Sequence, residues 1–120
     1  MKVYIVDAAA DMIEVMTLML DADGHRVASS VDSATAIPQI VEFKPDILLT
    51  DLVLAELDGL ELCHELRENT GRRAMSIAFV SAKTDEFWRE HASNAGAVGY
   101  ISKPLETNTF VETAEAFAAQ

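Results

Sequence analysis

The chain has 120 residues, half of them hydrophobic, and its 20 acidic residues against 9 lysines and arginines give a formal net charge of −11. This length and hydrophobicity exclude a disordered chain and suit one domain with a buried core. The negative charge argues against direct binding of nucleic acid or of an anionic membrane surface. The lone cysteine excludes an internal disulfide. No signal peptide or spanning segment is visible, so we expect a cytoplasmic protein.

Short apolar runs alternate along the chain with segments of helical periodicity. In chain order, we predict a strand at Val3–Val6, a helix beginning at Asp11, a strand at Arg26–Ser29, a helix at Ala34–Phe43, a strand at Ile47–Thr50, a helix at Leu57–Glu68, a strand at Ile77–Val80, a helix at Thr84–Ala95, a strand at Val98–Ile101 and a helix at Thr107–Ala119. Turn residues separate these elements.

Five strands that alternate with five helices in 120 residues are typical of an α/β fold with a parallel sheet covered on both faces. We expect residues 1–120 to form one domain of this kind. Pro38 interrupts the second predicted helix, so that helix either begins near Thr35 or is kinked. Thr84 is the expected N-cap of the fourth helix.

Four polar residues stand at the ends of predicted strands. Asp7, Asp51 and Ser81 follow the first, third and fourth strands, and Lys103 stands just beyond the fifth. The strands of a parallel sheet point the same way, so these side chains should meet at its carboxyl edge, where such folds place their sites.

This combination suits phosphoryl transfer, which depends mostly on positioning and charge neutralisation. Asp51 is a candidate nucleophile that would form an acyl phosphate. Lys103 offers a point charge and Ser81 a hydroxyl donor to phosphoryl oxygens. Carboxylates at this edge could also hold Mg²⁺.

Four stretches of the sequence resemble the receiver domains of two-component response regulators, the chemotaxis type. They are "IVD" at Ile5–Asp7, "PDILLTDLVLAELDG" at Pro45–Gly59, "VSA" at Val80–Ala82 and "AGAVGYISKP" at Ala95–Pro104. The resemblance covers essentially the whole chain. It implies a flavodoxin-like, doubly wound (βα)5 fold with strand order 2-1-3-4-5.

The resemblance also implies a function. Asp51 would take a phosphoryl group from a phosphohistidine on a sensor histidine kinase or a phosphotransfer protein. Asp7, Asp51 and the Val53 carbonyl would hold Mg²⁺. The protein would catalyse only its own phosphorylation and dephosphorylation, and it would signal to a downstream protein or to an output domain outside this chain.

Three further residues would transmit and read the phosphorylated state in such a protein. Ser81 and Lys103 would contact the phosphoryl group, and Tyr100 matches the aromatic switch position on the fifth strand. Structural interpretations stay open beside these. Asp7 could serve only to pair with Lys103, Ser81 could be a turn residue, and Tyr100 could be ordinary packing.

One departure from the family pattern concerns the metal. Receiver domains usually carry a second acid directly after the first, and here that residue is Ala8. Fewer carboxylates should weaken Mg²⁺ binding. The alternative function is therefore a degenerate receiver, an interaction module that does not use phosphate. A flavin-binding flavodoxin is disfavoured, because "DAAADM" at 7–12 lacks the Ser, Thr and Gly donors of a phosphate loop.

The adjacent aromatic residues Phe87 and Trp88 raise the question of a partner surface. Neighbouring residues on a helix point about 100° apart, so both cannot face one core. We therefore expect a partner surface on the fourth helix, fifth strand and fifth helix that includes Trp88.

Overall fold

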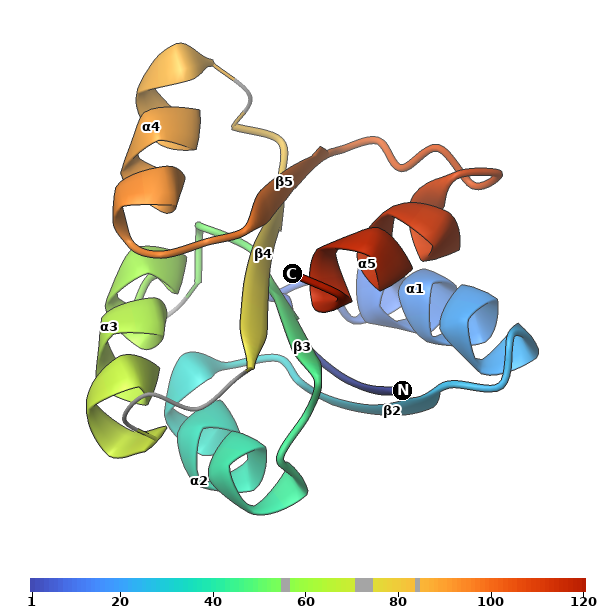
Figure 1. Cartoon of the computed structure of the whole chain (residues 1–120), viewed down its shortest axis with the longest axis horizontal. Coiled ribbons are helices and arrows are strands. Elements are labelled where there is room, and N and C mark those ends of the chain that lie inside the picture. Colours follow the sequence, from blue (N-terminus) through green and yellow to red (C-terminus); the bar gives the residue numbers. More distant parts are fainter. Residues whose placement is uncertain (55–56, 71–74, 84) are drawn as a thin grey trace.

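Figure 1 shows the computed structural model of the chain, which describes residues 1–54, 57–70, 75–83 and 85–120. The strands are β1 (Lys2–Val6), β2 (Arg26–Ser30), β3 (Ile47–Thr50), β4 (Ser76–Ser81) and β5 (Gly99–Ser102). The helices are α1 (Ala10–Ala22), α2 (Ser33–Phe43), α3 (Gly59–Thr70), α4 (Glu86–Asn94) and α5 (Phe110–Ala118). The strands pair in parallel in the order β2-β1-β3-β4-β5, so the predicted doubly wound flavodoxin-like fold is confirmed.

The helices cover both faces of this sheet. Helices α1 and α5 lie on one face, and α2, α3 and α4 lie on the other (Figure 1). Alternate strand residues supply the two hydrophobic cores. Tyr4 and Val6 pack toward α2 and α3, whereas Val3 and Ile5 pack toward α1 and α5. This alternation follows from the two-residue period of a strand.

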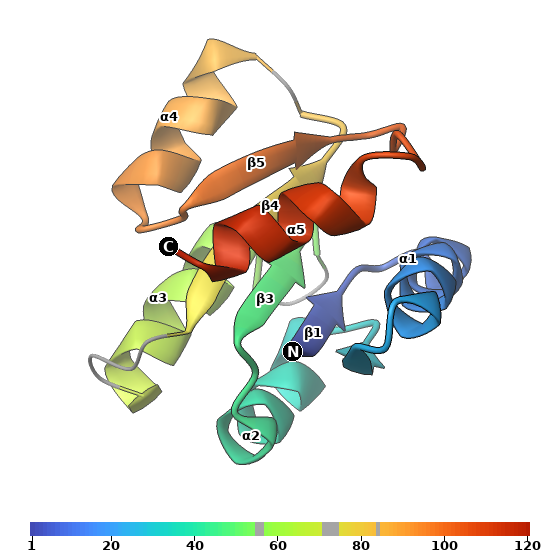
Figure 2. The ribbon, with the colours of Figure 1, turned by 45° about the vertical axis from the view of Figure 1, so that its right-hand side comes forward.

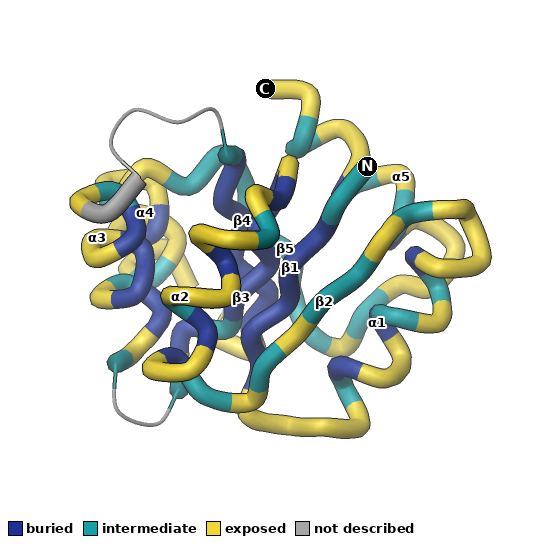
Figure 3. Tube along the Cα trace, turned by 90° about the horizontal axis from the view of Figure 1, so that it is seen from below, coloured by how far each residue is buried: buried dark blue, intermediate teal, exposed yellow. Residues whose placement is uncertain are grey.

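The central strands are more deeply buried than the edge strands (Figure 3). Every residue of β3 and β4 is buried, whereas β2 has exposed residues at Arg26 and Ser29. The side chain of Cys63 is also buried. Within the described ranges, no helix is long and apolar enough to cross a membrane.

Helix α2 begins at Ser33, before the start near Thr35 that would have placed Pro38 in the first turn. Asp32 is its N-cap and accepts a hydrogen bond from the Thr35 amide at 2.7 Å. The side chain satisfies an amide that would otherwise lack a helical partner. A start near Thr35 is therefore wrong, and Pro38 lies inside the helix.

Two other helix starts differ from the prediction because side-chain caps decide them. Asp58 accepts from the Glu61 amide at 2.8 Å while the Glu61 carboxylate accepts from the Asp58 amide at 3.1 Å, a capping box that starts α3 at Gly59. Asp85 caps α4 by accepting from the Trp88 amide at 3.2 Å. Thr84, the expected cap, lies outside the described residues.

Candidate functional site

The carboxyl edge of the sheet brings three of the predicted site residues into direct contact. Asp7 follows β1, Asp51 follows β3 and Lys103 follows β5. The Lys103 Nζ donates to Asp7 Oδ2 and to Asp51 Oδ2, in both cases at 2.8 Å. The side chains of Asp7, Asp51 and Lys103 are 2%, 14% and 16% exposed, so Asp51 is partly open to solvent.

Backbone amides fix the second oxygen of each carboxylate. Asp7 Oδ1 accepts from the Ala9 amide at 2.9 Å, just before α1. Asp51 Oδ1 accepts from the amides of Leu52 at 2.6 Å and Val53 at 3.3 Å. Each carboxylate is therefore held by the turn that follows its own strand, while its other oxygen contacts the lysine.

The charge of Lys103 is stabilised by this arrangement. Burial alone would lower the pKa of its ammonium group, because desolvation disfavours the charged form. The hydrogen bonds and charges of Asp51 and Asp7 outweigh that effect and hold the pKa above its ordinary value of 10.5. One fixed positive charge thus stands between two carboxylates.

Ser81 lies at the same edge, but its hydroxyl is directed to a neighbour in its own loop. The side chain is buried, and its Oγ accepts from the Lys83 amide at 3.1 Å. Its carbonyl accepts from the Lys103 amide at 3.0 Å, which ties β4 to β5 beside the site. As the acceptor in the bond from Lys83, the hydroxyl keeps its own O–H as a donor, and a rotation of the side chain toward a phosphoryl group on Asp51 would weaken that bond.

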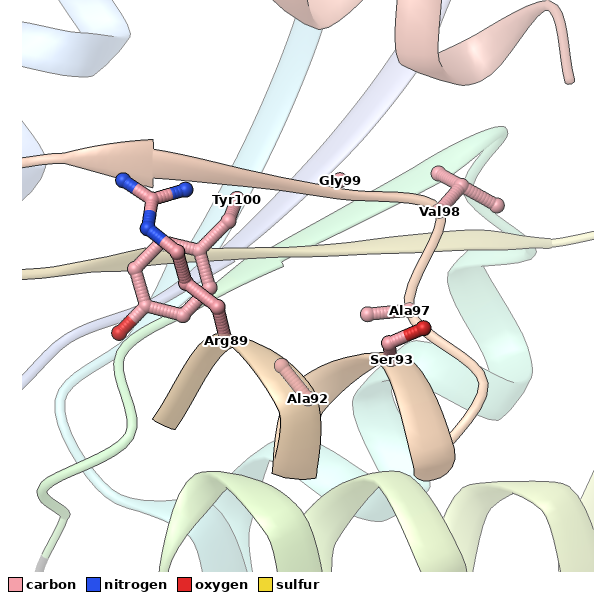
Figure 4. Close-up of a pocket in the computed structure, with 7 residues that line it drawn as sticks. All are labelled: Arg89, Ala92, Ser93, Ala97, Val98, Gly99 and Tyr100. Atoms are coloured by element: carbon pink, nitrogen blue, oxygen red, sulfur yellow. The ribbon is translucent and has the colours of Figure 1, made fainter. Parts of the chain in front are cut away.

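Tyr100 connects β5 to the loop between β4 and α4. Its hydroxyl donates to the Lys83 carbonyl. Burial, with smaller opposing contributions, raises the pKa of this phenol. The Arg89 guanidinium lies 4.8 Å from the ring centroid and donates to Ser102 Oγ at 2.9 Å, so the ring is covered from α4 (Figure 4). The same close-up shows the pocket of about 190 Å³ that Tyr100 and Arg89 line between α4 and β5.

The aromatic pair of α4 is divided between the core and the surface. Trp88 is partly buried and packs against the core on the α2–α3–α4 face, whereas Phe87 is 57% exposed. The Lys83 Nζ lies 5.9 Å from the Trp88 ring centroid. The most exposed aromatic of this helix is therefore Phe87, and the placement of Trp88 in a partner surface stays a prediction.

The donor set of the site suits a weakly held Mg²⁺. Within the described part of the chain, no three acidic, histidine or cysteine side chains converge. Mg²⁺ commonly binds one or two carboxylates and keeps several waters. Asp7 and Asp51 supply two carboxylates at this edge and Ala8 contributes no oxygen, while the Val53 carbonyl stays a predicted third donor. An ion held there would neutralise negative charge on a phosphoryl group.

Gly59 has a role at the site that the sequence analysis missed. Gly59 is the first residue of α3. The Gly59 amide also donates to the Leu52 carbonyl at 2.9 Å. A β-carbon at this position would overlap the carbonyl oxygen of Asp51 and press on the Phe79 ring. The start of α3 therefore packs directly on the backbone of Asp51.

Replacing Gly59 by alanine is expected to lower the free energy of unfolding by about 3 kcal/mol, because rigid backbone must move to admit the methyl group. Gly24→Ala is the control. It adds a methyl group in open space, at a φ of +84°, and should cost only about 1 kcal/mol. Urea unfolding of both variants measures the difference. An equal loss in the two variants would show that the contact at Gly59 is not close.

The comparisons with known proteins identify the family that has this fold and this cluster of Asp7, Asp51 and Lys103. The family model described as "Response regulator receiver domain" matches residues 3–115. The chain therefore belongs to the response regulator receiver family of two-component signalling.

Individual relatives span the whole receiver fold. The DNA-binding response regulator MtrA of Mycobacterium tuberculosis is 31% identical over 110 residues, which are 92% of this chain and 47% of MtrA. A putative response regulator from Chloroflexus aurantiacus is 28% identical, with a TM-score of 0.91 and coverage of 99% and 98% of the two chains. The BeF3-activated receiver domain of Klebsiella pneumoniae RstA has the same fold, at 22% identity, a TM-score of 0.90 and full coverage of both chains. The chain spans about half the length of the curated relatives it matches.

Proposed function

We propose that the chain accepts a phosphoryl group on Asp51 from a phosphohistidine of a sensor histidine kinase or a phosphotransfer protein. The observation that carries the proposal is the contact of one lysine ammonium with both Asp7 and Asp51 at 2.8 Å. A partly exposed carboxylate beside a fixed cation and two backbone amides suits attack on phosphorus. These groups stabilise charge that develops during the transfer.

In the proposed reaction, an oxygen of the Asp51 carboxylate forms a bond to phosphorus as the bond between phosphorus and the histidine nitrogen breaks. The imidazole leaves with the electron pair of that bond, and Asp51 becomes an acyl phosphate. Lys103 neutralises part of the phosphoryl charge, and the amides of Leu52 and Val53 keep the carboxylate oriented. Asp7 holds Lys103 in place and, with Asp51 and the Val53 carbonyl, would hold Mg²⁺.

We also propose a route by which phosphorylation changes a partner surface on α4, β5 and α5. Figure 2 shows β5 between these two helices. Lys83 contacts all three residues of this route. Its amide donates to Ser81 Oγ, its carbonyl accepts from the Tyr100 hydroxyl, and its ammonium lies over the Trp88 ring. If Ser81 turns to a phosphoryl group on Asp51, Lys83 loses a partner and the contacts of Tyr100 and Trp88 change with it.

Trp88 emission should therefore change when the protein is phosphorylated. Trp88 is the only tryptophan, so the signal has one source. Adding a small phosphodonor and Mg²⁺ should alter the spectrum of the wild type and leave Asp51→Asn unchanged. Lys83→Met, which removes the cation over the ring, should reduce the response. An unchanged spectrum in a sample that mass spectrometry shows to be phosphorylated would contradict this route.

The second candidate function is a phosphorylation-independent interaction module, and Ala8 is the observation that favours it. The Asp7–Lys103–Asp51 contacts favour the first candidate, because a module that does not use phosphate has no need for them.

We further propose that an output domain lies outside residues 1–120, because curated relatives are about twice as long. If that domain binds DNA, as the name of MtrA says of that protein, the acidic receiver described here would not be the part that does so.

Intact-mass spectrometry after incubation with acetyl phosphate and Mg²⁺ tests the proposed function. The wild type should gain one phosphoryl group and Asp51→Asn should gain none. Asp11→Asn, which removes an exposed acid of α1, should label like the wild type. Labelling of Asp51→Asn would remove Asp51 from the role. No labelling of the wild type, even from its own kinase, would favour the interaction module.

A further inference from the structure

A second polar pocket lies at the opposite edge of the sheet from Asp51. It has a volume of about 350 Å³ and is formed by alternate residues of β1 and β2 and by one face of α2. Lys2 and Tyr4 come from β1, Arg26 and Ala28 from β2, and Phe43 from the end of α2. This volume falls in the range of small-molecule sites. Lys2 begins β1, whereas Asp7 follows its end, so these two residues are roughly 16 Å apart along the strand at about 3.3 Å per residue.

Two cations meet in this pocket. Lys2 and Arg26 are direct partners in the parallel register of β1 and β2, so their side chains leave the sheet on the same face. Both lie over the Phe43 ring, with Lys2 Nζ at 5.2 Å and Arg26 Cζ at 5.8 Å from its centroid. Like charges directly opposite on neighbouring strands destabilise a sheet. The pairing is unexpected in a chain with 20 acids and only 9 lysines and arginines.

The surrounding protein accounts for only one of these charges. Lys2 Nζ donates to the Phe43 carbonyl at 2.7 Å, a favourable contact for a cation at the end of a helix. Among the described residues, the Arg26 guanidinium contacts only the Phe43 ring. Neither side-chain cation forms an ion pair with a carboxylate of the described residues. Asp46 accepts from the Lys2 backbone amide rather than from its ammonium, and Glu42 stands on the rim of the pocket.

We propose that this pocket, where Lys2 and Arg26 converge over Phe43, binds a small organic anion through a carboxylate or phosphate group. The anionic group would lie between the two cations and relieve their repulsion. Arg26 offers a planar fork of donors for two oxygens of either group. Gln39, whose Oε1 accepts from the Tyr4 hydroxyl at 2.6 Å, borders the pocket and leaves its amide donors for the ligand. Glu42 on the rim disfavours a ligand with several negative charges.

Benzoate and phenyl phosphate distinguish the two anionic groups on the same apolar body. Each is titrated into the ¹⁵N-labelled chain without Mg²⁺, and amide shifts are followed by NMR. We expect saturable shifts at Arg26, Ala28 and Phe43 with at least one probe, and the tighter probe identifies the preferred group. Arg26→Gln should weaken binding at least about tenfold, a difference of about 1.4 kcal/mol, because it removes the charged donor fork. Shifts that do not saturate, or that are confined to the amides around Lys103, would overturn the proposal.

Lys44→Gln is the matched control, since it removes one positive charge beside the end of α2 from a residue outside the pocket. It should change the affinity less than twofold. An equal loss of affinity in both variants would mean that the pocket attracts anions only through general charge and would overturn the proposal.

Arg26→Gln should also melt no lower than the wild type, because it removes a like-charge pair. A clearly lower melting temperature would show that Arg26 serves the fold and would overturn the proposal. Binding should persist in Asp51→Asn, so this site and the proposed phosphorylation succeed or fail separately.

Discussion

Replacing Lys103 by methionine is expected to lower the free energy of unfolding by about 3 kcal/mol near neutral pH. The variant leaves the carboxylates of Asp7 and Asp51 facing each other with side chains only 2% and 14% exposed. Removing one partner of a buried ion pair is costly because the remaining charge has no compensation. Lys44→Met, at an exposed lysine, should change stability by less than about 0.5 kcal/mol.

The same substitution should change how stability depends on pH. In the wild type the pKa of Lys103 is raised above 10.5. A raised pKa of a base means that its contribution is fully present below the unfolded value and is lost as pH rises through the folded value. Stability of the wild type should therefore decline more steeply above about pH 10.5 than that of Lys103→Met.

Urea unfolding of both proteins between about pH 7 and pH 11 measures these differences, a range that extends past the ordinary pKa of lysine, about 10.4. A difference in stability that is small and independent of pH would contradict the assignment of Lys103 as the counter-charge of the two carboxylates.

Restoring an acid with Ala8→Asp is expected to tighten Mg²⁺ binding by about tenfold or more. The new carboxylate at position 8 lies in the turn before α1 and would be the third one near the site, after those of Asp7 and Asp51. Two unit charges about 4 Å apart interact by about 4 kcal/mol at an effective dielectric of 20, so one added carboxylate is a large change. The added acid should also repel its neighbours and lower stability in the absence of metal. Phosphorylation of Asp51 should become faster.

Calorimetric Mg²⁺ titration of the wild type and of Ala8→Asp measures this effect without relying on activity. Ala10→Asp is the matched control, because it adds the same charge at an exposed position of the first turn of α1. It should leave the affinity nearly unchanged. Equal affinities in the wild type and Ala8→Asp would show that Ala8 is not a defect in the metal site.

The convergence of Asp7, Asp51 and Lys103 could be predicted from the sequence, because parallel strands bring their carboxyl ends to one edge whatever the details of packing. The strand order came from the family resemblance rather than from periodicity. Helix starts were less predictable, because Asp32, Asp58 and Asp85 act as caps through side-chain geometry that the hydrophobic pattern does not contain.

Features that depend on contacts distant in sequence could not be predicted. The close approach of Gly59 to Asp51 requires the start of α3 to pack on the end of β3. Which aromatic of α4 faces inward depends on how the helix lies on the sheet. The Lys2–Arg26 pair exists only through the register of β1 with β2, and alternation in each strand by itself says nothing about register.

The most direct test of the central claim is to identify the residue that carries the phosphoryl group. The protein is phosphorylated with acetyl phosphate and Mg²⁺ and then reduced with borohydride, which converts an aspartyl phosphate to homoserine. Peptide mass spectrometry then locates that residue. The proposed function predicts homoserine at position 51 alone. Homoserine at position 7 or at another acid, with Asp51 unmodified, would contradict it.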